Sequence, residues 1–144
     1  MDEKTIVKKK KKAKGITAKA KKKTAVARAV IRQGKGVVRI NKRNLLTFQP
    51  RQIQEFIMEP LEIAAEKAKE VSISINVNGG GFMTQAVAAR SAIAKALVLF
   101  FKDEKLKKKM LAYDRLLLVD DVRRKESKKQ LGTGARRRKQ KSKR

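Results

Sequence analysis

Residues 71–101, VSISINVNGGGFMTQAVAARSAIAKALVLFF, carry the clearest structural signals in the chain. Residues 71–77 alternate between apolar and polar side chains, which is typical of a strand with one face on a core. The glycines at 79–81 end this strand, and a helix is predicted from about residue 83 to residue 101. The buried stripe of that helix contains Val87, Ile93, Ala94, Leu97, Val98 and Phe101.

The flanking segments predict the other elements. Residues 24–32 (TAVARAVIR) and 37–40 (VVRI) surround a Gly-containing turn, which predicts a β-hairpin. Pro50 begins a helix that Pro60 is expected to interrupt, with a further helical turn or two at 61–69. Two apolar segments follow, one with Leu106, Met110 and Leu111 and one at residues 116–119. The order β-β-α-β-α-α predicts an α+β fold: a two-layer sandwich of a small mixed sheet with helices on one face.

The positive charge is concentrated at the two ends of the chain. The 144 residues include 40 Lys and Arg against 13 Asp and Glu, for a net charge of +27. Residues 1–23 carry +9, residues 24–122 carry +7, and residues 123–144 carry +11. Three regions are therefore expected: a disordered Lys-rich arm at 1–20, a globular domain at 21–122, and an extended basic tail at 123–144.

The composition indicates a polyanionic partner and excludes metal and catalytic sites that depend on Cys or His. A charge of this size calls for a polyanion, with nucleic acid as the first expectation and an anionic membrane surface as the second. The absence of Cys and His removes thiolate metal sites, the usual general base and the commonest metal ligand. No signal peptide and no membrane-spanning run is recognised. We therefore predict an intracellular protein that is not an enzyme. We expect it to bind no cofactor, no small-molecule substrate and no membrane.

Candidate RNA-binding residues lie at the start of the domain and around the glycines. Lys22 and Lys23 lead into the first predicted strand, where Arg28 and Arg32 share one face. The glycine run stands between a strand and a helix N-terminus, so it serves either as a tight turn alone or as a turn whose backbone also holds an RNA phosphate. Gln85 and Arg90, early in the helix, are equally compatible with phosphate contact and with ordinary solvated positions. The candidates in this part of the chain are Lys22, Lys23, Arg28, Arg32, Gly79, Gly80, Gly81, Gln85 and Arg90.

The C-terminal tail offers the densest charge. A flexible GTGA segment at 132–135 precedes Arg136, Arg137 and Arg138, and basic residues continue to the last position. An extended arginine-rich peptide fits crevices in folded RNA and presents planar forks of donors to phosphates. A nonspecific solubilising or localisation tail is the alternative. A DNA-compacting protein and a phosphate-binding enzyme are the rival functions for the whole chain, though no Walker motif accompanies the glycines.

Several spaced motifs resemble a universal family of small-subunit ribosomal proteins, the S9 family, over about residues 20–144. The segment KKKTAVARAVI at 21–31 is similar to the opening of that family, and VNGGGFMTQAVAARSAIAKAL at 77–97 is similar to its glycine–helix motif. Bacterial members have Pro and Phe where this chain has Lys139 and Lys141, so the archaeal and eukaryotic branch fits better. Other matching positions are Gly34, Gly36, Asn41, Pro60, Leu61, Asp121, Arg123, Glu126, Lys128, Lys129, Gly132, Ala135, Arg136, Gln140, Ser142, Lys143 and Arg144.

The resemblance implies a ribosomal S5 domain-2-like fold in the head of the small subunit, bound to ribosomal RNA (rRNA) beside neighbouring head proteins. Arg123, Lys128 and Lys129 join the rRNA-binding candidates on these grounds. The resemblance further implies that the tail reaches peptidyl-site tRNA and that Ser142, Lys143 and Arg144 contact it. A cytoplasmic location in the ribosome follows. Residues 1–20 have no family counterpart, and nothing is carried over to them.

Overall fold

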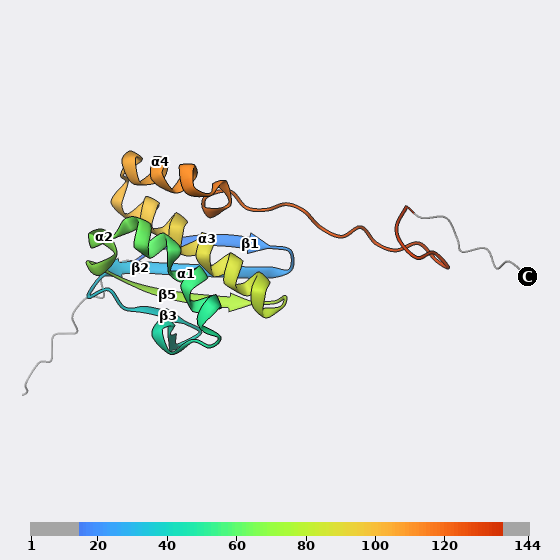
Figure 1. Ribbon diagram of the computed structural model, residues 1–144, viewed down its shortest axis with the longest axis horizontal. Helices are drawn as coiled ribbons and strands as arrows, with labels where there is room; N and C mark the ends of the chain where they lie inside the picture. The colour runs from blue at the N-terminus through green and yellow to red at the C-terminus, as the bar shows by residue number, and fades with distance from the viewer. Residues whose placement is uncertain (1–14, 137–144) are drawn as a thin grey trace, which may run out of the picture.

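Strand β5 is the centre of a five-stranded sheet with helices on one side (Figure 1). The computed structural model describes residues 15–136. The strands are β1 (Ile16–Lys22), β2 (Ala25–Gln33), β3 (Val38–Ile40), β4 (Arg43–Asn44) and β5 (Val71–Asn78). The helices are α1 (Arg51–Ala64), α2 (Glu66–Lys69), α3 (Phe82–Phe101) and α4 (Glu104–Tyr113), with short 3-10 helices η1 (Leu45–Thr47) and η2 (Arg115–Leu117).

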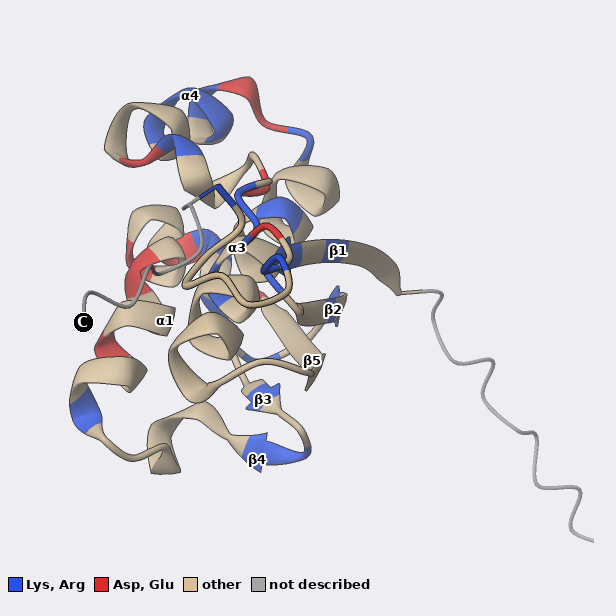
Figure 2. Cartoon of the chain, turned by 90° about the vertical axis from the view of Figure 1, so that its right-hand side faces the viewer, with Lys and Arg blue, Asp and Glu red and all other residues tan. Residues whose placement is uncertain are grey.

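The sheet order is β1-β2-β5-β3-β4, with β3 parallel to β5 and the other neighbours antiparallel. Figure 2 shows the strands one after another from β1 to β4, with α1, α3 and α4 on one side of the sheet. The predicted mixed sheet with helices on one face is therefore confirmed. The strand at 71–77 and the helix ending at Phe101 are also confirmed, because β5 buries its alternate apolar side chains and α3 spans the predicted range.

The predicted hairpin of residues 24–32 with 37–40 is wrong. Strand β5 lies between β2 and β3, so these two strands are not neighbours. The Gly-containing connection passes the start of β5 instead, where Gly34 and Gly36 donate backbone hydrogen bonds of 2.9 Å to the carbonyls of Glu70 and Val71. The true hairpin joins β2 to β1, through a turn at Lys23 and Thr24.

Strand β1 was assigned in part to the N-terminal arm by the sequence. The described fold already includes Ile16, so the expected boundary at residue 21 falls inside this strand. Ala18 and Ala20 face the core while the intervening Thr17, Lys19 and Lys21 are exposed. Alternation of alanine with lysine follows the period of a strand but lacks the β-branched side chains that usually mark one.

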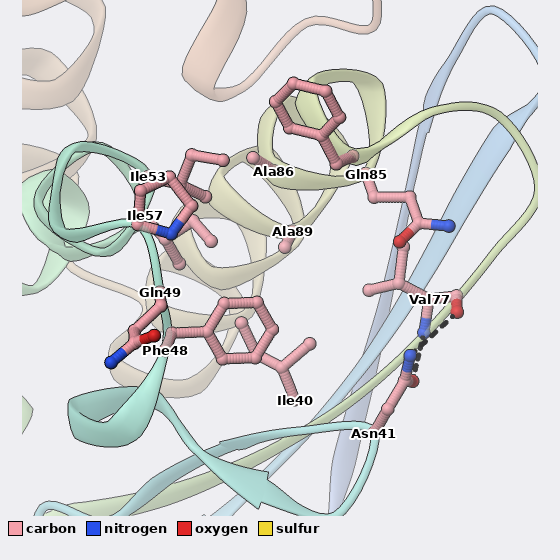
Figure 3. A pocket seen from close by; sticks show the side chains of 12 residues that line it. Ile40, Asn41, Phe48, Gln49, Ile53, Ile57, Val77, Gln85, Ala86 and Ala89 are labelled. Atoms are coloured by element: carbon pink, nitrogen blue, oxygen red, sulfur yellow. Dashed lines mark hydrogen bonds between the residues drawn. The ribbon is translucent and has the colours of Figure 1, made fainter.

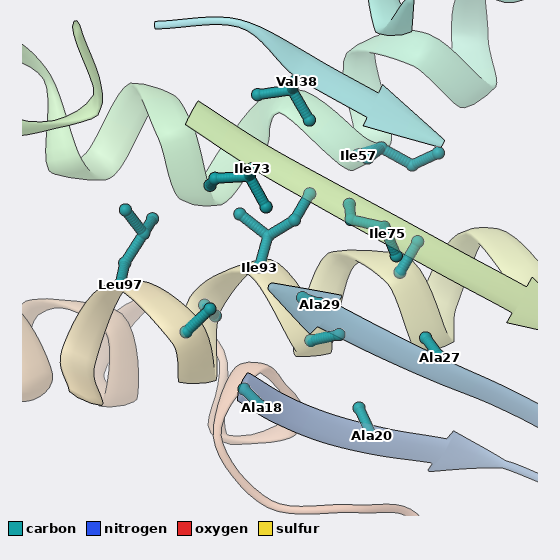
Figure 4. Packing of buried hydrophobic residues seen from close by; sticks show 14 of the residues in the cluster. Ala18, Ala20, Ala27, Ala29, Val38, Ile57, Ile73, Ile75, Ile93 and Leu97 are labelled. Carbon is teal, nitrogen blue, oxygen red and sulfur yellow. The ribbon is translucent and has the colours of Figure 1, made fainter. Parts of the chain in front are cut away.

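The core between sheet and helices is rich in alanine, as Figure 4 shows. Alanines of β1 and β2 face α3, which supplies small residues of its own on the facing side. Small side chains let a helix approach a sheet closely, and larger ones such as Ile73, Ile93 and Leu97 fill the space beside this contact. Helix α1 packs beside α3, so both helices cover the same face.

Pro60 does not interrupt the first helix as predicted. Helix α1 continues through it to Ala64, and the break comes at Ala65, whose φ of 46° is left-handed. The proline ring is buried in the core, which offsets the hydrogen bond that a proline cannot donate within a helix. Position in the fold, rather than residue type alone, decides where this helix ends.

Helix α3 is, by length and composition alone, able to cross a membrane. Its 20 residues include Arg90 and Lys95, so they do not form a continuous apolar run. More than half of its most apolar window is buried inside the protein, against the sheet and α1. That burial is typical of the core helix of a domain without a membrane span.

Candidate nucleic-acid interface

The face of the sheet opposite the helices is basic and open. No helix packs on it within residues 15–136, and its exposed side chains are mostly basic or small and polar. The strand register places Lys19 of β1 beside Arg28 of β2, and Arg28 beside Asn76 of β5. The exposed members of this face are Thr17, Lys19, Lys21, Arg28, Arg32, Arg39, Ser74, Asn76 and Asn78, and Ser72 beside them is half-buried.

Two hollows divide the open face. One, of about 320 Å³, is lined by Arg28 and Asn76 with the end of β5. The other, of about 540 Å³, is lined by Arg32 and Arg39 on either side of Ser72 and Ser74. Within the described residues, none of these three arginines is within 4.0 Å of a carboxylate. Their guanidinium groups are therefore available to an external anion.

The chemistry of this face suits phosphates better than bases. Arginine offers planar pairs of donors to phosphate oxygens, and the Ser and Asn side chains add neutral hydrogen-bonding groups. No aromatic residue occurs in any of the five strands. The sheet therefore lacks the aromatic side chains on which RNP-type domains stack unpaired bases.

The glycine run is held tightly against the turn between β1 and β2. Gly79 has a φ of 77°, and a Cβ atom there would lie 2.5 Å from the carbonyl oxygen of Thr24. The half-buried Gln85 donates a 3.1 Å hydrogen bond from Nε2 to the carbonyl of Gly79. These contacts account for Gly79 as part of a turn.

Arg90 requires a correction, because it is buried rather than exposed. Only 7% of its surface is accessible, and its guanidinium pairs with Glu59 at 2.5 Å and with Asp114 at 2.8 Å. The same group lies 4.5 Å from the ring centre of Phe56. An arginine with two internal carboxylate partners is not available to RNA, so we remove Arg90 from the RNA-binding candidates and assign it to the core.

Comparison with known proteins identifies the family. Residues 20–144 match the family described as ribosomal protein S9/S16. The chain belongs to this family. Among curated relatives, small ribosomal subunit protein uS9 of Picrophilus torridus is 47% identical over 122 residues, which cover 85% of this chain and 92% of that protein.

Two further relatives carry the same name. The protein of Thermoplasma acidophilum is 50% identical, covering 85% of this chain and 95% of its own length. The protein of Methanococcus maripaludis is 44% identical, covering 76% of this chain and 81% of its own length. All three sources are archaeal, so the predicted S9 family and its archaeal-like branch are confirmed.

In this S9/S16 family member, an acidic pair anchors the start of the tail to the domain. Asp120 accepts hydrogen bonds from the backbone N–H of Lys21, at 3.2 Å, and from Nζ of Lys95, at 2.6 Å. Asp121 pairs with Lys22 and with Arg123, and the latter two residues were both predicted to bind RNA. The Arg123 guanidinium, followed by the Lys22 ammonium, holds the pKa of the Asp121 carboxyl well below the ordinary aspartate value.

This anchor brings together basic residues from distant parts of the sequence. A hollow of about 790 Å³ is lined by Lys22, Lys23 and Thr24 on one side and by Arg123, Arg124 and Lys125 on the other. Only one carboxylate, that of Asp121, pairs with these residues within the described part of the chain. The predicted candidates Lys22, Lys23 and Arg123 therefore form one surface.

Farther along the tail, the charges are exposed. Lys128 and Lys129 are exposed, and Arg136 forms a two-point ion pair with Glu126 at 2.7 and 3.0 Å. The Arg136 guanidinium lowers the pKa of the Glu126 carboxyl. The remaining predicted tail residues, Arg137, Arg138, Ser142, Lys143 and Arg144, lie outside the described residues.

Sequence reasoning missed part of the open face. Arg39 was detectable, since it is the exposed middle residue of the short alternating segment VRI in β3. Lys19 was missed because residues 1–20 were assigned to the arm, and Lys21 because the first strand was expected to begin only at Thr24, whereas β1 runs from Ile16 to Lys22. Asp120 gave no signal of its own, because its role depends on Lys95 and the backbone of β1, both far away in sequence.

Proposed function

We propose that this chain is a structural constituent of the small ribosomal subunit that binds rRNA in the subunit head and contacts peptidyl-site tRNA through its C-terminal end. The observation that carries the rRNA part is the open sheet face, with arginines that have no internal acid partner within residues 15–136. The names of the archaeal relatives support the subunit assignment. In this proposal the protein works in the cytoplasm beside other head proteins and has no enzymatic role.

The rRNA contacts are assigned to two adjoining surfaces. The first is the open face, where Arg28, Arg32 and Arg39 would bind phosphate oxygens. The second is the hollow between Lys23 and Arg124, from which the tail continues along the RNA with Lys128, Lys129 and Arg136 to Arg138. The backbone of Gly79 to Gly81 and the side chain of Gln85, at the end of the first surface, complete the proposed contacts.

Replacing Arg28 and Arg32 together by glutamine is expected to weaken rRNA binding by about 10- to 100-fold at physiological salt, because each charge-assisted contact contributes on the order of 1 kcal/mol or more. The measurement is the affinity of the full chain for a transcript of the head domain of small-subunit rRNA. Arg43→Gln with Arg51→Gln, which removes equal charge at exposed positions outside the open face, is the matched control. Equal losses in both double variants would mean that only net charge matters.

The tRNA contact rests on the family resemblance, and the S9/S16 match extends to residue 144. A terminal Lys and Arg provide donors to phosphates without reading bases, as a site that receives every tRNA requires. Deleting Lys143 and Arg144 is expected to increase dissociation of tRNA from the peptidyl site severalfold, without loss of the protein from the subunit. Filter binding of tRNA to small subunits carrying the truncated chain measures this. Unchanged tRNA dissociation from such subunits would contradict the assignment.

A further inference from the structure

Helix α4 presents a row of lysines that the functions above do not use. Lys105, Lys108 and Lys109 stand at i, i+3 and i+4, so they share one exposed side of the helix. The opposite side is fixed to the domain by Leu106 and Met110, both buried in the core. The helix start is capped by Asp103, whose Oδ1 accepts a 2.8 Å hydrogen bond from the backbone N–H of Lys105. The three lysines therefore lie on a helix that is packed against the domain and capped at its start.

These three lysines, the α4 ridge, carry charge that the described protein does not neutralise. Within residues 15–136, none of the three ammonium groups is within 4.0 Å of a carboxylate. Even Glu104, which lies one turn before Lys108, forms no ion pair with it. Asp103 is already paired with Lys67, whose ammonium lowers the pKa of that carboxyl. Like charges at this spacing destabilise a helix by a few tenths of a kcal/mol per pair. A bound polyanion would relieve that repulsion.

The α4 ridge and the open sheet face belong to different sides of the domain. Helix α4 packs on α1, α3 and η2, within the helical layer, whereas the open face is the other surface of the sheet. Figure 2 shows α4 on the helical side and the strands presenting their other face away from it. A sheet–helix sandwich separates the two surfaces by roughly two layers, each on the order of 10 Å thick. One RNA segment lying on the sheet therefore does not reach α4.

We propose that the α4 ridge is a second RNA-docking surface, so that the domain holds two RNA segments at once, one on each side. RNA fits this ridge better than a protein does, because lysine is depleted in protein–protein interfaces and is a good point-charge partner for phosphate. Lys105 and Lys109 also line one side of a groove of about 430 Å³ between α4 and the junction of α1 and α2, whose other charged lining residues are Glu66, Lys67 and Asp103. This inference rests on the proposed function, since it assumes that the open face binds rRNA.

Site-specific photocrosslinking in assembled small subunits tests the proposal. A diazirine-bearing lysine analogue replaces Lys108 in one full-length chain and Arg32 in another, and sequencing identifies the crosslinked nucleotides. We expect rRNA crosslinks from both positions, in two segments separated in the rRNA secondary structure. Protein crosslinks alone, or no crosslink, at position 108 would overturn the second surface, provided that position 32 yields RNA. Crosslinks from both positions to one segment would overturn the bridging. No RNA at either position would instead overturn the proposed function itself.

Retention in salt-washed subunits gives an independent measurement. The triple change Lys105→Gln, Lys108→Gln and Lys109→Gln is expected to release the chain from the subunit at a lower KCl concentration than wild type, because phosphate contacts make binding salt-dependent. The triple change of the same residues to arginine keeps the charge and helix propensity and should be retained like wild type. Equal release of the glutamine variant and wild type would overturn the proposal.

Discussion

Replacing Arg90 by alanine is expected to destabilise the folded domain by about 3–5 kcal/mol, the usual cost of breaking a buried ion pair from one side. The guanidinium connects α3 with Glu59 of α1 and with Asp114, which begins the η2 turn. Without it, the two carboxylates are left without their cationic partner, and Phe56 loses a stacked neighbour. Urea unfolding of the full-length chain, followed by circular dichroism, measures the loss.

A second substitution at position 90 separates the charge of the side chain from its shape. Arg90→Lys keeps one positive charge but cannot reach both carboxylates with a planar fork, so an intermediate loss is expected. The control is Arg51→Ala, which removes an exposed arginine paired with Glu55 one turn away and should cost less than about 1 kcal/mol. If Arg90→Ala unfolded at the same urea concentration as Arg51→Ala, the buried ion pairs would have no structural role.

Arg90 also illustrates what sequence alone could predict. Its position in the first half of a helix was readable from the pattern of residues 82–101, but its partners come from two other elements, 31 and 24 positions away. Local periodicity cannot reveal such partners. The open face was more accessible to prediction, because the period of two places Arg28 and Arg32 on one side whatever the neighbouring strands are.

The sheet shows the same division between local and distant information. Strand β5 and helix α3 follow from their own side chains, since β-branched alternation and an apolar stripe are local signals. The pairing of β2 is different, because its partner β5 begins 38 residues after Gln33 and displaces the expected neighbour β3. Strand β1 was hidden because its buried side chains are alanines, which suit the close approach of α3 but resemble a solvated segment in sequence.

Replacing Gly79 by alanine is expected to destabilise the domain by about 1–3 kcal/mol through backbone strain, with a further cost from crowding. The φ of 77° at Gly79 is unfavourable for any residue with a Cβ atom, and that atom would lie 2.5 Å from the carbonyl oxygen of Thr24. This oxygen belongs to the turn between β1 and β2, so relief of the contact has to shift the hairpin edge that supports Lys22 and Lys23.

Gly81→Ala is the matched control, because a Cβ atom there meets nothing within 4 Å and the φ of Gly81 is −95°. Urea unfolding of the two full-length variants should show a large loss for Gly79→Ala and a change within about 0.5 kcal/mol for Gly81→Ala. Equal stability of both variants would mean that the glycine run is not needed for the turn, and selection for close approach of an RNA backbone would then be the better account of Gly79.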